Sequence, residues 1–284
     1  MSGKGKEEGH RKKRKFEGKI IVITGASSGI GRQAALDFVN KGAGSIILIA
    51  RSESKLLELK ETLQVVKESK GVEIVAYTCD ISKKEDVLRT GTEILERFGH
   101  IDLLINNAGF GEFGKVENQS IEQIEEVMRI NYFGIVYCTK IFLNSMLSRH
   151  SGHIVNVASL AASFGVAGMA GYCASKYAML GFSESLYHEL YGTGVRITVV
   201  SPIGVKTNFF NNQSFENHRP NYTGFMLEAS AVSKAILAAA NSSRLEIIVP
   251  FYVRAGVWFK HTLPYAVNPI AGALFRRQLN KAPK

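Results

Sequence analysis

Short apolar runs alternate along the chain with longer segments in which apolar residues recur every three or four positions. The runs are rich in Val, Ile and Leu and end at turn residues, as buried strands do. They predict seven strands, at residues 20–23, 45–50, 73–79, 102–106, 153–158, 195–200 and 245–249. Helical segments lie between them, near residues 34–39 and at 52–69, 82–98, 120–149, 171–191 and 228–241. This alternation predicts an α/β fold: a parallel sheet with helices on both faces and a ligand crevice at the carboxyl ends of its strands.

Two serines mark expected helix starts. Serine is a preferred N-cap because its hydroxyl accepts a hydrogen bond from an amide of the first turn. Ser82 is expected to cap the helix at 82–98, and Ser120 opens the helix at 120–149 with the sequence Ser-Ile-Glu-Gln. No internal repeat or linker divides the stretch between the first and last strands, so we expect a single domain.

Three glycines separate the first strand from the helix that follows it. Gly25, Gly29 and Gly31 lie in the sequence Thr-Gly-Ala-Ser-Ser-Gly-Ile-Gly. A strand, a glycine turn and a helix start can cradle a dinucleotide pyrophosphate, because glycine lets the backbone approach and the helix start offers amides. The spacing is GxxxGxG rather than the general GxGxxG, so a glycine-rich turn in an ordinary strand–helix unit remains an alternative.

Tyr172 and Lys176 are four residues apart in a predicted helix, so their side chains share one face, about one turn apart. An ammonium beside a phenol favours the phenolate, and we expect it to lower the pKa of Tyr172. Ser159 follows the strand at 153–158 and could reach the same substrate oxygen. The three residues predict a proton donor, its electrostatic partner and a hydrogen-bonding group for a carbonyl or alcohol. The alternative is a Tyr and a Lys on a solvated helix.

In order and spacing, these motifs resemble those of the short-chain dehydrogenases/reductases. The matching elements are Thr24–Gly31, Asn106-Asn-Ala-Gly109, Asn131, Ser159 and Tyr172-Cys-Ala-Ser-Lys176, and the match covers about residues 18 to 250. The resemblance implies a single-domain, doubly wound, Rossmann-type sheet of about seven strands. It also implies an enzyme that uses NAD(H) or NADP(H) to interconvert an alcohol and a carbonyl.

The resemblance further implies which residues bind the cofactor. They are Gly25, Ser27, Ser28, Gly29, Ile30, Gly31, Arg51, Asp80, Ile81, Asn107, Ala108, Gly109, Tyr172, Lys176, Pro202, Ile203, Val205 and Thr207. Dinucleotide folds selective for NAD place an acid near the end of the second strand, where this chain has Ala50 and Arg51. An arginine can pair with a 2′-phosphate, so we expect NADP(H) to be preferred, with NAD(H) possible. A surface arginine is the alternative, because Ser28 in the glycine turn offers no second base.

The catalytic residues implied by the resemblance are Asn131, Ser159, Tyr172 and Lys176. Ser159 and Tyr172 would bind the carbonyl oxygen, Tyr172 would donate a proton to it, and Lys176 would hydrogen-bond the nicotinamide ribose. Asn131 resembles the residue that holds a water in the family's proton relay; alternatively it is a mid-helix Asn that faces solvent. Ile203 stands where the family usually has a glycine after the proline, and this difference would reshape the nicotinamide pocket.

The net charge of +10 is concentrated at the two ends of the chain. Residues 1–19 hold eight Lys or Arg and three Glu, whereas residues 251–284 hold six Lys or Arg and no acid. Basic ends suit an anionic surface, either a membrane or a nucleic acid. A disordered, solubilising segment is an equal alternative for the N-terminal end.

These charges divide the chain into three parts. We expect a flexible basic extension at 1–18, a dinucleotide-binding catalytic domain at 19–250 and a basic, aromatic tail at 251–284. The tail mixes aromatic and basic residues, which suits a bilayer interface, but closing the pocket or joining subunits is favoured over membrane contact. Pro264 and Pro269 should interrupt any single long helix there.

The three cysteines, Cys79, Cys138 and Cys173, are odd in number and lack metal-ligand spacing. They indicate a reducing compartment and predict neither a disulfide framework nor a metal site. No window of about eighteen apolar residues occurs, so no spanning helix is expected, and the basic N-terminus lacks the apolar core of a secretory signal. We expect a cytoplasmic protein, with peripheral contact to an anionic membrane surface as a further possibility.

These features favour an NADP(H)-dependent reductase that converts an apolar or lipid-like ketone to a secondary alcohol and assembles as a homodimer or homotetramer. Aromatic residues in 208–227 suit a mobile lid over such a substrate, or part of the core; they are Phe209, Phe210, Phe215, Tyr222 and Phe225. A non-catalytic dinucleotide-sensing scaffold is the alternative, which the complete catalytic set disfavours. A nucleic-acid binder is disfavoured because the basic N-terminus lacks interleaved aromatics. The substrate, the physiological direction and the oligomeric state do not follow from the sequence.

Overall fold

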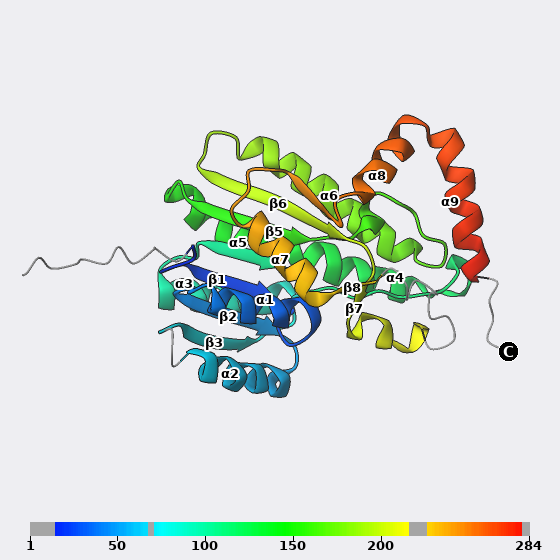
Figure 1. Ribbon diagram of the computed structural model, residues 1–284. Coiled ribbons are helices and arrows are strands. Elements are labelled where there is room, and N and C mark those ends of the chain that lie inside the picture. Colours follow the sequence, from blue (N-terminus) through cyan, green and yellow to red (C-terminus); the bar gives the residue numbers. More distant parts are fainter. Residues whose placement is uncertain (1–14, 68–70, 216–225, 280–284) are drawn as a thin grey trace, which may run out of the picture.

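The computed structural model describes residues 15–67, 71–215 and 226–279. Within them, seven parallel strands form one sheet in the order β3-β2-β1-β4-β5-β6-β9 (Figure 1). The strands are β1 (Ile20–Thr24), β2 (Ser45–Ala50), β3 (Glu73–Thr78), β4 (Leu103–Asn106), β5 (Gly152–Val157), β6 (Val195–Pro202) and β9 (Glu246–Val249). Each begins and ends within two residues of its predicted bounds, and the predicted doubly wound fold is confirmed.

Helices cover both faces of the sheet (Figure 1). One face carries α1 (Gly29–Asn40), α2 (Glu53–Lys67) and α7 (Ala229–Ala239), and the other carries α3 (Lys84–Phe98), α5 (Gly134–Ser148) and α6 (Ala170–Glu189). Each layer has its own apolar core: Phe38 and Leu59 lie buried on the first face, and Ile94 and Phe142 on the second. The two cores leave the carboxyl ends of the strands free to hold a site, at the switch point where the order reverses between β1 and β4.

The two expected helix caps differ in outcome. Ser120 caps α4 (Ile121–Met128) in a capping box with Gln123, as predicted. Ser82 does not cap α3, which begins after Lys83 without a side-chain cap. Its hydroxyl instead donates to Asp80 Oδ1 over 2.8 Å. The prediction was wrong: α3 begins at Lys84, so Ser82 lies one residue before the N-cap position, and its hydroxyl is directed at the carboxylate of Asp80.

The packed body begins before residue 19. Phe16 is buried and meets the ring of Phe38 edge to face, with 4.9 Å between ring centroids. Residues 15–18 therefore belong to the domain rather than to the basic extension, and the rest of the extension, 1–14, lies outside the described residues. A truncation meant to leave the domain intact should stop at residue 14.

The tail forms two helices, α8 (Val253–Thr262) and α9 (Pro264–Leu279), which project beyond the carboxyl ends of the strands (Figure 1). The chain breaks before Pro264, as predicted, but Pro269 lies inside α9 and does not interrupt it. A proline removes one helical hydrogen bond, to the carbonyl four residues back. That carbonyl belongs to Tyr265, whose exposure lets water satisfy it. Among the described residues, no helix is both long and apolar enough to cross a membrane.

Candidate active site

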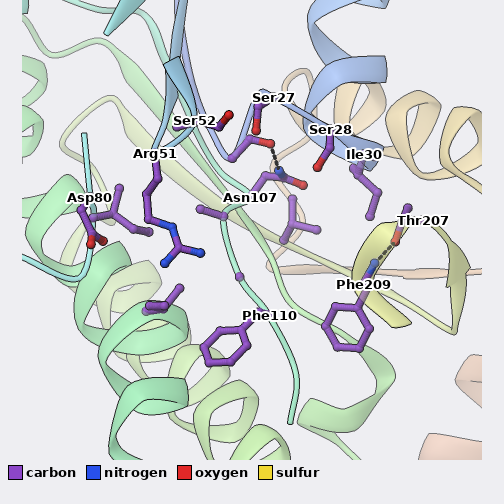
Figure 2. A pocket seen from close by; sticks show the side chains of 18 of the residues that line it. Ser27, Ser28, Ile30, Arg51, Ser52, Asp80, Asn107, Phe110, Thr207 and Phe209 are labelled. Atoms are coloured by element: carbon purple, nitrogen blue, oxygen red, sulfur yellow. Dashed lines mark hydrogen bonds between the residues drawn. The ribbon is translucent and has the colours of Figure 1, made fainter. Parts of the chain in front are cut away.

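Two adjoining cavities lie at the carboxyl end of the sheet. The first, which we call the groove, has a volume of about 370 Å³ and runs past the ends of β1, β2, β3 and β4 (Figure 2). The second, which we call the apolar cavity, has a volume of about 410 Å³ and lies beside β5, β6 and the tail. Both are lined by Ile30, Ala158, Tyr172, Thr207 and Phe209. Tyr172 thus faces both spaces.

The glycine turn forms one wall of the groove. Gly25 and Gly29 have φ angles of +64° and +54°, which disfavour any residue with a side chain. A Cβ on Gly25 would lie 2.7 Å from Ala108 Cα, and one on Gly31 would collide with the Gly25 carbonyl. The side chain of Asn107 ties the turn to the next strand by donating to the carbonyl of Thr24 over 3.0 Å and to that of Gly25 over 3.2 Å.

These contacts give the glycines different roles. Gly25 and Gly29 line the groove together with Ser27, Ser28 and Ile30, whereas Gly31 lies beneath the lining and allows α1 to pack on the turn. Ser28 makes no side-chain cap, so the first-turn amides of α1 stay available to an anion. The open backbone, the helix start and the volume of the groove fit a dinucleotide pyrophosphate.

Positive charge gathers at one end of the groove. Arg51 extends into it with Asp80 close by (Figure 2), and Lys55 lines the same end. Asp80 is held in place by Ser82, which donates from its amide over 3.1 Å and from its hydroxyl. The glycine turn contains no basic residue, but Lys55 in α2 provides a second base beside Arg51. Sequence reasoning missed Lys55, although its position four residues after Arg51 and in the first turn of a helix could have shown it.

Lys176 is buried in the wall of the groove and lines it. Its Nζ donates to the carbonyl of Val157 over 3.2 Å, and a Cβ on Gly109 would come within 3.5 Å of it. Burial lowers the pKa of Lys176 to about 8, because the charged amine has lost most of its water. The tighter contact at residue 109 is with Asn131, since a Cβ there would lie 2.9 Å from Asn131 Oδ1.

Asn131 lies in a π-helical turn, Arg129–Phe133, that joins α4 to α5. Its side chain is fully buried: Oδ1 accepts from the amide of Phe110 over 3.0 Å, and Nδ2 donates to the Phe110 carbonyl over 2.9 Å and to Ser175 Oγ over 3.0 Å. The alternative of a solvent-facing Asn is wrong. Asn131 fixes the loop after β4 against α6, and the π turn is the kind of helical irregularity that often marks a functional position.

Tyr172 is buried, and its pKa is raised to about 12. Burial of the phenol is the main cause, and a hydrogen bond with Ser159 partly opposes it. The expected lowering by Lys176 is wrong for this structure. Lys176 Nζ lies 5.7 Å from the centre of the tyrosine ring and donates to a backbone carbonyl, so it does not offset the loss of water around the phenol. Tyr172 therefore keeps its proton across the neutral pH range.

The apolar cavity begins at Ser159 and Tyr172. Ser159 Oγ accepts from the amide of Ala161 over 3.1 Å, which fixes its side chain at the end of β5. Among the described residues, those that line the cavity carry no charge. They include Leu160, Phe164, Val166, Met169, Pro202, Ile203 and Val205. The expected cofactor contacts Pro202, Ile203 and Val205 thus lie on this cavity, while Thr207 lines both spaces.

The aromatic residues expected between 208 and 227 divide between two roles. Phe209 and Phe210 line the apolar cavity, and Phe209 meets Tyr172 edge to face at 5.3 Å. Phe215 is fully buried beneath them and belongs to the core. Tyr222 and Phe225 lie outside the described residues. Three lining residues come from the tail, Tyr252, Val253 and Phe275. Closing the pocket was one of the roles expected for this segment, but nothing local in the sequence shows which of its residues reach the cavity.

Comparison with known proteins yields both sequence and structure matches. A family model described as short chain dehydrogenase matches residues 19–218. Short-chain dehydrogenase/reductase family 16C member 6 of Bos taurus is 32% identical over 261 residues, covering 89% of this chain and 79% of its own length. Epidermal retinol dehydrogenase 2 of Mus musculus is 32% identical over 250 residues, covering 87% and 79%.

Two solved structures extend the comparison to the fold. A short chain dehydrogenase/reductase from Burkholderia phymatum in complex with NAD superposes with a TM-score of 0.77 at 29% identity, covering 87% of this chain and 94% of its own. A short-chain dehydrogenase from Sphingobium yanoikuyae in complex with NADPH gives a TM-score of 0.76 at 26% identity, covering 89% and 95%.

Proposed function

The chain belongs to the short-chain dehydrogenase/reductase family and is an NAD(P)-dependent oxidoreductase of C–OH and C=O groups, and we propose that it is an NADPH-dependent reductase of an apolar, uncharged ketone. The observation that carries this proposal is the position of Tyr172. Its protonated phenol faces a groove with a cationic end on one side and a cavity without charges on the other.

The preference for NADPH is supported by the charges after β2. NAD-selective folds have an acid here to bind the ribose 2′-hydroxyl, whereas this chain has Ala50 and Arg51, with Lys55 close by. Two cations suit a 2′-phosphate. When bound, NADPH would supply the hydride that reduces the carbonyl carbon. Because cells keep NADPH largely reduced, this cofactor would favour the reductive direction.

The chain's own residues would then handle the carbonyl oxygen. We propose that Ser159 and Tyr172 hydrogen-bond to this oxygen and that Tyr172 donates its proton to it. A general acid must hold its proton until the transition state, and Tyr172, with its pKa raised to about 12 by burial, is protonated at neutral pH. Lys176 would bind the nicotinamide ribose from below. Asn131 would act mainly through its side-chain contacts with Phe110 and Ser175, so a water relay would have to use its main chain.

The substrate class follows from the apolar cavity. A charged substrate would lose its water on entering this cavity and would meet no opposite charge there. We therefore propose a neutral, apolar ketone as the substrate. Some of the similar proteins are named retinol dehydrogenases, after an apolar alcohol. Retinol is a primary alcohol, whose oxidation gives an aldehyde rather than a ketone. These names therefore support an apolar substrate, and both ketones and aldehydes should be assayed. The homodimer or homotetramer expected from the sequence stays a prediction, and light scattering would measure the oligomeric state.

A panel of carbonyl compounds tests this proposal. We expect oxidation of NADPH with neutral, apolar ketones and at least tenfold lower kcat/KM for analogues of equal size that carry a carboxylate. The assay follows the absorbance of the reduced cofactor, with NADH as the comparison. Cofactor binding without turnover of any ketone or aldehyde would instead favour the non-catalytic scaffold.

Lys176 predicts a pH dependence of cofactor binding. With its pKa lowered to about 8, Lys176 is charged below that pH and neutral above it. A charged hydrogen bond is stronger than a neutral one by about 1 kcal/mol, so the Kd for NADPH should rise about three- to fourfold as the pH increases from 7 to 9. Fluorescence of the reduced nicotinamide measures this Kd.

The matched control for this effect is Lys176→Met, which keeps the apolar stem and has no charge at any pH. It should bind NADPH more weakly at pH 7 and show a nearly flat profile. A rise in Kd of the same size in the variant would assign the titration to another group.

A further inference from the structure

The segment 251–279, which comprises α8, α9 and the two residues before them and which we call the hairpin, exposes large apolar side chains to solvent. Tyr265 is 95% exposed, Phe251 83% and Ile270 73%, and Trp258 and Leu274 are also exposed. Residues 253–276, the part of the two helices whose side chains the structure describes, include no buried residue. Isolated apolar residues on a surface are ordinary, but a continuous group on one projecting element marks an interaction surface.

The charge of this surface indicates its partner. Residues 251–284 contain six Lys or Arg and no acid. Arg254 and Arg276 are exposed on the hairpin itself. Aromatic and aliphatic residues interleaved with bases are typical of elements that lie in the interface of an anionic bilayer. A second copy of the chain fits less well, because a two-fold contact through this face would place like charges together without an acid to pair them.

The hairpin also forms the outer wall of the apolar cavity. Tyr252 and Val253 line the cavity at the start of α8, and Phe275 lines it near the end of α9. The exposed surface and the cavity therefore adjoin at the start of α8: Phe251, two residues before the helix, is exposed to solvent, and the next two residues line the cavity.

Lys260 pins the hairpin beside the catalytic residues. Its Nζ donates to the carbonyl of Ser163 and, over 2.7 Å, to the hydroxyl of Tyr177. It also lies over the rings of Phe164 and Tyr177, at 5.3 and 5.4 Å from their centres. Phe164 lines the apolar cavity, and Tyr177 follows Lys176 in α6. The hairpin is thus anchored on one side and exposed on the other.

We propose that the hairpin docks on an anionic lipid surface and that the apolar cavity takes its ketone directly from that surface. This inference rests on the proposed function for the nature of the substrate, but the docking itself does not. An apolar, poorly soluble ketone would reach Tyr172 by this route.

The test combines vesicle binding with turnover, using the full chain. Sedimentation with vesicles of phosphatidylcholine, with and without about one third phosphatidylglycerol, measures docking. The variant Phe251→Ser/Tyr265→Ser/Ile270→Ser removes three exposed apolar side chains that do not line either cavity. We expect wild type to sediment with the anionic vesicles, to be released by high salt, and to lose at least tenfold in partition in the triple variant.

Tyr191→Ser is the matched control. Tyr191 is 91% exposed but lies between α6 and β6, at the opposite end of the strands. It should bind vesicles as wild type does. Because residues 1–14 are also basic, the contribution of the hairpin is read from the difference between the variants. Equal binding by the triple variant and wild type, or equal binding to neutral and anionic vesicles, would overturn the docking.

Turnover separates docking from substrate delivery. The triple variant should reduce a water-soluble ketone like wild type but lose at least fivefold in kcat/KM for a ketone dissolved in the anionic vesicles. Equal losses for both ketones would overturn delivery from the surface. Vesicle binding with no reduction of any ketone would contradict the proposed function and leave the docking standing. A change of oligomeric state in the triple variant, seen by light scattering, would assign the hairpin to a second copy and overturn the docking.

Discussion

Replacing Tyr172 with Phe is expected to lower ketone turnover by about 10²–10⁴-fold, the usual effect of losing a general acid. The substitution removes one hydroxyl and keeps the ring, so the packing of residue 172 against Phe209 is retained. The oxygen of the substrate would still meet Ser159 but would have no proton donor. Affinity for NADPH should stay within about twofold, because the phenol lies at the junction of the cavities rather than at the cationic end of the groove.

Tyr187→Phe is the matched control, since Tyr187 lies on the same helix, lines neither cavity and is partly buried against the apolar core. It should leave steady-state turnover close to wild type. Near-normal turnover by Tyr172→Phe would remove this residue from its proposed role. Equal losses in turnover and in NADPH affinity would make it a structural residue of the groove.

Removing both cations at the end of the groove should abolish the preference for NADPH. Each charged hydrogen bond to a phosphate contributes about 1.5–3 kcal/mol, so Arg51→Ala/Lys55→Ala should raise the Kd for NADPH by at least about 10²-fold. The Kd for NADH, which has no 2′-phosphate, should change by less than about threefold. Titration of the fluorescence of each reduced cofactor measures both constants, and the two single variants divide the effect between the residues.

Lys60→Ala provides the comparison in α2, because Lys60 lies outside the lining of the groove. It should bind both cofactors as wild type does. If the double variant weakened NADPH and NADH alike, Arg51 and Lys55 would support the shape of the groove rather than select the phosphate. Salt should weaken NADPH binding more in wild type than in the double variant.

The sequence predicted the sheet well because buried parallel strands leave a strong local signal. The apolar run at residues 45–50 and the observed β2, Ser45–Ala50, coincide, since every residue in it is buried. The glycine turn was also readable, because its positive φ angles and close contacts admit no other residue. Helix starts were less certain: Ser120 and Ser82 look alike in the sequence, but Ser120 caps its helix whereas Ser82 bonds to Asp80 and the helix begins after Lys83.

The electrostatics of the candidate site could not be predicted in the same way. Sequence spacing places Tyr172 and Lys176 on one face of α6, but the direction of the pKa shift depends on how much water the phenol loses. Phe209, far along the chain, packs against the phenol and contributes to that loss, while the hydrogen bond with Ser159 opposes its effect on the pKa. Asn131 is similar, because its burial depends on the loop that carries Phe110. Contacts between distant segments determine the pKa of Tyr172 and the burial of Asn131, and local sequence patterns do not show such contacts.

The tail lines only one of the two adjoining cavities, and this has a consequence for how the enzyme would work over many cycles. The hairpin residues Tyr252, Val253 and Phe275 line the apolar cavity but not the groove. An enzyme resting on a bilayer through its hairpin would therefore keep the groove open to water. Spent cofactor could leave and fresh cofactor enter while the protein stays on the surface. Such an enzyme would be processive, because one binding event at the membrane would allow many turnovers. Its rate would depend on the amount of ketone in the membrane surface.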